Sequence, residues 1–130
     1  YNWYNMKLTN NEIFAFHNGL AECVKAGVNG GVFCYAITKN IRKLEKELKA
    51  INEAVEKLRI DKAQKGKDGE PIINDGNYVI EDMDGLKKEV DKILVLEVEL
   101  DVFKIKADAI PDGVTPALTN GIWWMLDGVE

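Results

Sequence analysis

The sequence of 130 residues contains no serine and only one histidine, His17. The absence of serine excludes a serine nucleophile. A histidine that acts as a general base needs an acidic or nucleophilic partner, and no motif supplies one for His17. We interpret His17, which follows Phe16, as a structural residue. The sequence therefore predicts a protein that is not an enzyme, with no catalytic residue and no cofactor.

Only two cysteines are present, Cys23 and Cys34, and they lack the CxxC or Cys/His spacing of a zinc site. We expect two free thiols in a protein from a reducing compartment. A disulfide between them is the alternative, because the glycine-rich residues 27–31 could fold the two segments back on each other. No metal site is predicted.

Long apolar runs are also missing. No stretch approaches the roughly 20 residues that span a bilayer, so no membrane partner is predicted. With 46% apolar and 30% charged residues, the chain has the composition and length of one globular domain. The stretch "YNWYN" before Met6 reads as a non-native or upstream prefix, residues 1–5, and we expect a single domain over residues 6–130.

The net charge of −5 is distributed unevenly along the chain. Residues 39–67 hold 10 basic and 5 acidic side chains, whereas residues 68–101 hold 3 basic and 11 acidic ones. Neighbouring segments of opposite charge often pack against each other, and we expect that here. Glutamates between residues 45 and 56 interrupt the basic stripe, so nucleic acid is not an expected partner.

Helical periodicity is the strongest pattern in the sequence. Thr9 and Glu12 form a capping box, which predicts a helix that begins after Thr9. Residues 32–65 contain no proline and predict a second helix of about 34 residues, or ~50 Å. Seven apolar side chains on it follow the spacing of a coiled-coil seam. The seam residues are Ile37, Ile41, Leu44, Leu48, Ile51, Val55 and Leu58.

So long a helix needs something to cover its seam. The candidates are the first helix, a later helix of the same chain and a second copy of the chain, and the sequence leaves all three open. We therefore treat the seven seam residues as candidate interaction residues.

The stretch "DGEPIINDGNYVIED" raises the question of a calcium loop. An EF-hand loop needs acidic or amide ligands at its first, third and fifth positions and Gly at the sixth. If Gly76 takes the sixth position, Pro71 and Ile73 occupy the first and third, where neither supplies a ligand. Asp75-Gly76 instead favours a type I′ turn, which predicts a β-hairpin with Ile73 opposite Tyr78.

Two further elements follow the hairpin. The stretch "EDMDGLKKEVDKIL" predicts a helix that lies antiparallel to the distal half of the long helix. The stretch "EVELDVFKIKA" alternates with period two and predicts one strand, with a phase slip at Val102 and Phe103 that indicates a β-bulge. The predicted fold is α+β and mostly α. Its long helix belongs to an antiparallel helical hairpin or bundle, with a small β-hairpin and one further strand.

The adjacent pair Trp123 and Trp124 is a second candidate for contact with a partner. Thr115 and Pro116 predict the start of a short last helix that carries both tryptophans. Neighbouring residues on a helix point about 100° apart, so one face cannot bury both rings. One tryptophan is therefore a candidate contact residue. The alternative is that both are partly buried against the long helix.

Three stretches, in this order, carry a resemblance: "YAITKNIRKLEKELKAINEA", "DGEPIINDGNYVIED" and "LEVELDVFKI". They resemble a family of small proteins encoded by tailed phages and prophages of Gram-positive bacteria, whose members are usually described only as a domain of unknown function. The resemblance covers residues 6–126. It implies a phage origin and brings no catalytic residue.

We therefore expect a non-enzymatic phage or prophage protein that acts through protein–protein interaction in virion assembly or a virion-associated complex. The alternative is a phage effector that binds and inhibits a host defence or transcription protein through the acidic residues 68–101. Expected partners are a phage structural protein or a host protein, with a homodimer as a further option. The expected location is the cytoplasm of the bacterial host or the virion.

Overall fold

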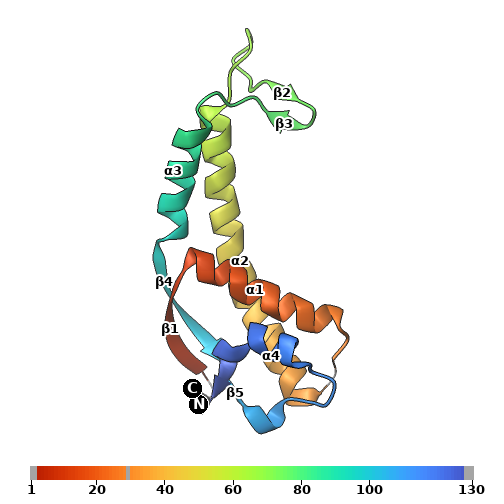
Figure 1. Cartoon of the computed structure of the whole chain (residues 1–130). Helices are drawn as coiled ribbons and strands as arrows, with labels where there is room; N and C mark the ends of the chain where they lie inside the picture. Colours follow the sequence, from red (N-terminus) through yellow and green to blue (C-terminus); the bar gives the residue numbers. More distant parts are fainter. Residues whose placement is uncertain (1–2, 29, 128–130) are drawn as a thin grey trace.

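The computed structural model describes residues 3–28 and 30–127 and has two parts, a compact base and a long arm (Figure 1). The fold is α+β and mostly helical, as the sequence predicts. In the part of the chain that is described, no helix is both long enough and apolar enough to cross a membrane.

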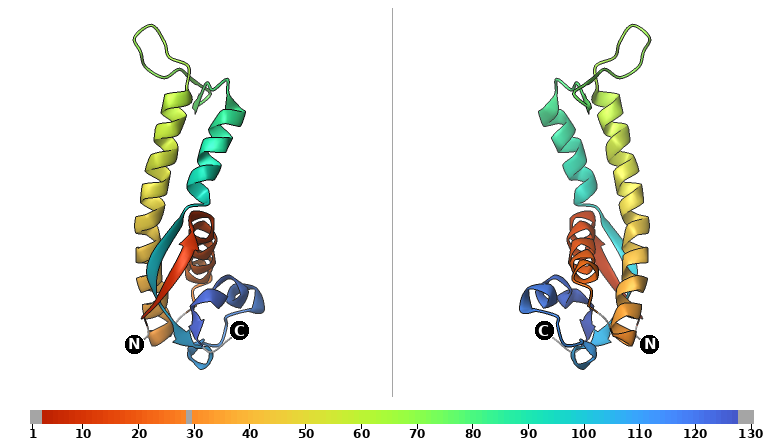
Figure 2. Two further views of the ribbon diagram at one scale, coloured as in Figure 1. Left: turned by 90° about the vertical axis from the view of Figure 1, so that its left-hand side faces the viewer. Right: turned by 90° about the vertical axis from the view of Figure 1, so that its right-hand side faces the viewer.

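The arm is built on helix α2 (Gly31–Lys62), which extends from the base to the tip. Helix α3 (Met83–Leu94) packs against the distal half of α2 and runs in the opposite direction (Figure 2). Lys62 at the end of α2 lies 3.6 Å from Asp82, the N-cap of α3. The basic end of one helix thus meets the acidic start of the other.

A small hairpin closes the tip of the arm. Strands β2 (Ile73–Asn74) and β3 (Asn77–Tyr78) pair antiparallel, with Ile73 opposite Tyr78. The turn residues Asp75 and Gly76 have positive φ angles of 52° and 79°, which a type I′ turn requires. Glycine adopts such angles without strain and aspartate tolerates them, so this dipeptide permits the tight reversal.

The base contains an antiparallel strand pair, β1 (Trp3–Thr9) with β4 (Glu97–Phe103). Leu8 opposite Val98 and Met6 opposite Leu100 face the core, with charged pairs such as Lys7 and Glu99 between them. The domain predicted over residues 6–130 leaves out the start of β1. In the structure, residues 3–5 continue the pairing with β4 and are part of the fold.

The stretch predicted as a single bulged strand forms two strands with different partners. After Phe103 the chain leaves β4, and strand β5 (Ile105–Lys106) pairs in parallel with β6 (Leu126–Asp127). Val102 and Phe103 are both buried, so the phase slip marks the point where the chain passes from one sheet to the other. The prediction of one further strand beside the hairpin is therefore wrong.

Helix α1 (Asn10–Lys25) crosses the lower part of α2, and the short helix α4 (Pro116–Gly121) packs on α1. The capping box of Thr9 and Glu12 starts α1. A side chain at Gly19 would collide with α4, because its Cβ would lie 2.7 Å from the carbonyl carbon of Gly121. The two glycines allow the helices to touch through their backbones.

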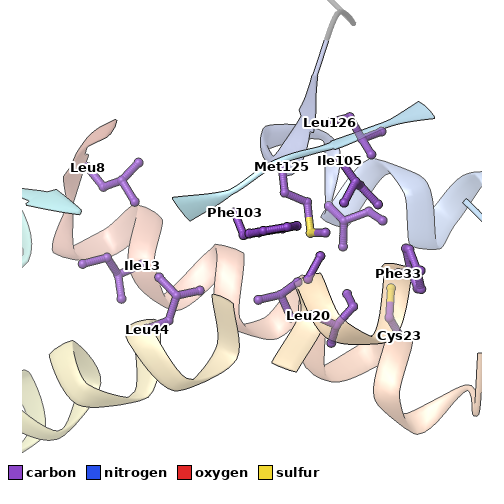
Figure 3. Packing of buried hydrophobic residues seen from close by; sticks show 13 residues of the cluster. Leu8, Ile13, Leu20, Cys23, Phe33, Leu44, Phe103, Ile105, Met125 and Leu126 are labelled. Atoms are coloured by element: carbon purple, nitrogen blue, oxygen red, sulfur yellow. The ribbon is translucent and has the colours of Figure 1, made fainter. Parts of the chain in front are cut away.

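One hydrophobic core fills the base and draws on every element there (Figure 3). Its buried side chains come from positions far apart in the sequence. They include Leu8, Ile13, Leu20, Cys23, Phe33, Leu44, Phe103, Ile105, Met125 and Leu126. Burial on the arm is sparser and includes Ile51, Ala63 and Leu86.

A polar side chain, Asn40 of α2, lies fully buried within this apolar core. Its Nδ2 donates to the carbonyl oxygen of Phe103 at 2.9 Å, and its Oδ1 accepts from the Phe103 backbone N–H at 2.7 Å. The carboxamide therefore satisfies both backbone groups of the residue at which β4 ends. A buried backbone group without such a partner costs free energy.

We expect Asn40→Ala to lower the free energy of unfolding by about 2–4 kcal/mol, because it leaves two buried backbone groups unpaired. Urea denaturation followed by circular dichroism measures this. Asn52→Ala removes an exposed asparagine of the same helix and should change the value by less than about 0.5 kcal/mol. Equal losses in the two variants would contradict a special role for Asn40.

Gly19→Ala should destabilise the fold by about 1–3 kcal/mol, because the new methyl group forces α4 away from α1. The matched control is Gly31→Ala at the start of α2, where an added Cβ meets nothing within 4 Å. Alanine has the higher helix propensity, so the control should be neutral or stabilising by up to about 1 kcal/mol. Thermal unfolding of both variants separates the collision from the general effect of replacing glycine.

Candidate interaction surface

The chain's own core covers much of the seam on α2. Ile37 and Leu44 belong to the core of the base, and Ile41 and Leu48 pack against it. Farther along α2, Ile51 is also buried. Val55 and Leu58 are half-buried on the arm, along which α3 lies. Of the three possible partners for the seam, elements of the same chain occupy most of it.

The two adjacent tryptophans are placed differently. The Trp124 ring stacks on Phe16 of α1 at a centroid distance of 4.5 Å, and its Nε1 donates to the carbonyl oxygen of Gly121. Trp123 is 43% exposed and remains accessible. The aromatic partner of Trp124 belongs to α1, and the two adjacent tryptophans differ in how far they are covered.

The other chemistry-bearing residues that the sequence singles out are His17 and the two cysteines. His17 is half-buried at the edge of a groove on α2. Cys23 and Cys34 are free thiols, and burial raises the pKa of Cys23 because it disfavours the thiolate. Within residues 3–28 and 30–127, no group of three or more His, Cys, Asp or Glu side chains is arranged to hold a metal ion.

A groove of about 560 Å³ lies at the tip of the arm, and we call it the tip groove. Helix α2, the hairpin and the start of α3 each contribute to its walls. Two of its apolar side chains face solvent, Ile73 with 62% and Met83 with 57% of their surface exposed. Its walls also include Arg59, Tyr78, Ile80 and Leu86.

Hydrogen bonds hold the hairpin wall of the tip groove against α2. The Tyr78 hydroxyl donates to Glu56 at 2.6 Å, and Glu56 lies 3.8 Å from Arg59. Backbone bonds join Gln64, just after α2, to Ile72 and Val79 on the two sides of the hairpin. These bonds hold the hairpin, and with it the exposed Ile73, in place against α2.

Most of the lining of the tip groove belongs to the acidic residues 68–101, and Glu56 and Arg59 of the basic segment complete it. Asp75, Glu81 and Asp84 are exposed around the hairpin and the start of α3. The pKa of Asp82 is lowered, first because its carboxylate accepts a hydrogen bond from the Gly85 backbone N–H and also because Lys62 is near. This carboxylate stays charged, and the surroundings of the groove favour a partner with basic side chains.

No protein-family model, no curated protein and no solved structure matches this chain.

The sequence patterns do not predict the tip groove, although two signals of it are present. Met83 continues the 3–4 spacing of Leu86, Val90 and Ile93, but it lies at the first turn of α3. In a hairpin with two residues in each strand, little remains to cover Ile73. The ends of regular patterns are thus where apolar side chains become exposed.

The Tyr78 pKa should report the hydrogen bond between Tyr78 of the hairpin and Glu56 of α2. It is raised because the hydroxyl donates to the Glu56 carboxylate, so Glu56→Gln should lower it. Folding favours the protonated phenol. The stabilisation that the hydrogen bond gives the folded state is therefore complete below the unfolded pKa of about 10 and is lost as pH rises through the folded pKa. Titration of a ¹³C-labelled Tyr78 ring by NMR measures the shift. Tyr35, which is not hydrogen-bonded to Glu56, is the internal control. An unchanged Tyr78 pKa in the variant would contradict the hydrogen bond between Tyr78 and Glu56.

Proposed function

We propose that the chain is a non-enzymatic protein that acts by binding another protein, with the tip groove as its contact surface. The observation that carries this proposal is the exposure of Ile73 and Met83 in the lining of one groove at the end of an arm. Apolar side chains at the centre of a polar surface are typical of the residues that anchor an interface.

The electrostatic surroundings define the chemistry of the partner. Residues 68–101 carry a net charge of −8, and most of the groove wall belongs to them. The complementary ligand is a protein segment that offers apolar side chains flanked by lysine or arginine. Charge complementarity of this kind speeds encounter and rejects acidic competitors.

The resemblance to small phage and prophage proteins supports a role in virion assembly or a virion-associated complex, in the cytoplasm of the bacterial host. An arm that presents a contact surface away from its core suits a protein that joins other components. The second candidate is an effector that binds and inhibits a host defence or transcription protein. The acidic surface favours that reading, because it would serve as the contact with the host protein.

The experiment is an affinity pull-down of the tagged chain from prophage-induced cells, with the bound proteins identified by mass spectrometry. Ile73→Asp combined with Met83→Asp should reduce recovery of the partner at least about tenfold, because it places charge in the apolar contact. The matched control combines Val24→Asp with Val32→Asp, which are 58% and 56% exposed on other elements. The control should recover the partner as the parent chain does.

The identity of the captured proteins separates the two candidate functions. Recovery of portal, tail or baseplate proteins supports assembly, whereas recovery of one host protein supports the effector. Glu81→Lys with Asp84→Lys should weaken recovery of either class of partner, because both would contact the acidic surroundings of the tip groove, and Asp108→Lys with Asp112→Lys is its control in the base. Full recovery of every partner by the Ile73→Asp, Met83→Asp variant would overturn the tip groove as the contact surface.

A further inference from the structure

A second groove, of about 710 Å³, lies along the middle of α2. At one end is His17 of α1, and at the other is Ile60, one turn beyond Glu56, which also lines the tip groove. Leu48 and Ile60 provide apolar contacts there. We call the stretch of α2 from residue 45 to residue 60 that lines this groove the mid-arm face.

Four of the charged residues on the mid-arm face, spaced four apart along α2, alternate in sign. Glu45, Lys49, Glu53 and Lys57 all line the groove and are all exposed. The ion pairs among the described residues join other side chains, Glu56 to Arg59, Lys62 to Asp82 and Glu89 to Lys92. These four charges thus form an ordered pattern, and none of them takes part in an ion pair among residues 3–28 and 30–127.

We propose that the mid-arm face binds a second copy of the chain, with the two α2 helices antiparallel. A two-fold axis level with Ile51 places Glu45 of one copy beside Lys57 of the other, since both lie six residues from the centre. The same axis places Lys49 beside Glu53. All four charges on each copy then meet an opposite charge, as a self-complementary two-fold interface requires.

The same pattern disfavours the parallel arrangement. In a parallel, in-register pair, each glutamate would face a glutamate and each lysine a lysine, and like charges repel. The pattern therefore selects one orientation and disfavours the other.

Helix packing geometry is compatible with this arrangement. Residues spaced by four form a ridge on a helix, and two such ridges that interdigitate cross at about −50°, the commonest class in globular proteins. The charged residues form one ridge, and Leu48, Asn52, Glu56 and Ile60 form the neighbouring ridge. A crossing at this angle places the charged ridges of the two copies side by side where the helices meet.

The size of the face sets the strength of the dimer. Sixteen residues of helix extend over about 24 Å, or about four turns. One face of so short a stretch buries less area than the roughly 800 Å² per partner of a standard interface. We therefore expect a weak dimer, governed by protein concentration and by salt. The mid-arm face shares Glu56 with the tip groove, but Ile73 and Met83 lie on the hairpin and α3 and not on α2. A dimer therefore leaves the apolar contact of the proposed partner site in place, and either proposal can fail without the other.

The test is a charge-swap experiment read by sedimentation equilibrium from ~10 µM to ~1 mM, a range that spans weak affinities. Glu45→Lys with Glu53→Lys makes the ridge entirely basic, and Lys49→Glu with Lys57→Glu makes it entirely acidic. The parent chain should shift from monomer to dimer as concentration rises. Each variant alone should remain monomeric, and an equimolar mixture of the two should form a heterodimer. Lys87→Glu with Lys88→Glu, which changes two exposed lysines of α3, should dimerise like the parent chain.

Salt provides a second reading, because added NaCl shortens the range of these interactions and should weaken the dimer. Circular dichroism of each variant verifies that the helices are intact, as expected for exposed substitutions. A parent chain that stays monomeric at ~1 mM would overturn the proposal. Equal dimerisation of the single variants, or a mixture without heterodimer, would also overturn it.

Discussion

Asn40 reaches from the middle of a helix and completes the hydrogen bonding of a strand residue, Phe103. At Phe103 the chain leaves one sheet and, two residues later, enters another, so the Phe103 backbone groups need a partner from elsewhere. The carboxamide supplies both a donor and an acceptor in a site that water does not reach. This pairing fixes α2 relative to both sheets, and the orientation of the arm depends on it.

The contrast between base and arm explains where binding surfaces can occur. In the base, helices and strands meet around one core, and most large apolar side chains are covered. Two helices side by side cover only one face of each other, so the arm leaves other faces of α2 open to solvent (Figure 2). The main hydrophobic core therefore lies at one end of the molecule, and the tip groove and the mid-arm face lie along the arm.

Local patterns predicted local structure well, and long-range partners poorly. The α+β class and its high helical content follow from apolar periodicity, and the Thr9 capping box locates the start of α1. Strand β1 was missed, although Tyr4, Met6 and Leu8 alternate with polar residues, because the first residues were set aside as a prefix. Asn40 gives no signal in the sequence, since its partner lies 63 positions away. The tip groove likewise depends on three segments that only the folded chain brings together.

The pairing of β1 with β4 has a consequence for the order of folding. Trp3 meets Phe103, so the first strand must wait for about 100 residues of chain before its partner exists. The arm, in contrast, is made of segments that follow one another closely, and contacts of short sequence separation form faster. During synthesis α2, the hairpin and α3 can therefore assemble while β1 still lacks its partner strand. The unpaired edge of β1 exposes this strand to misassembly in the nascent chain.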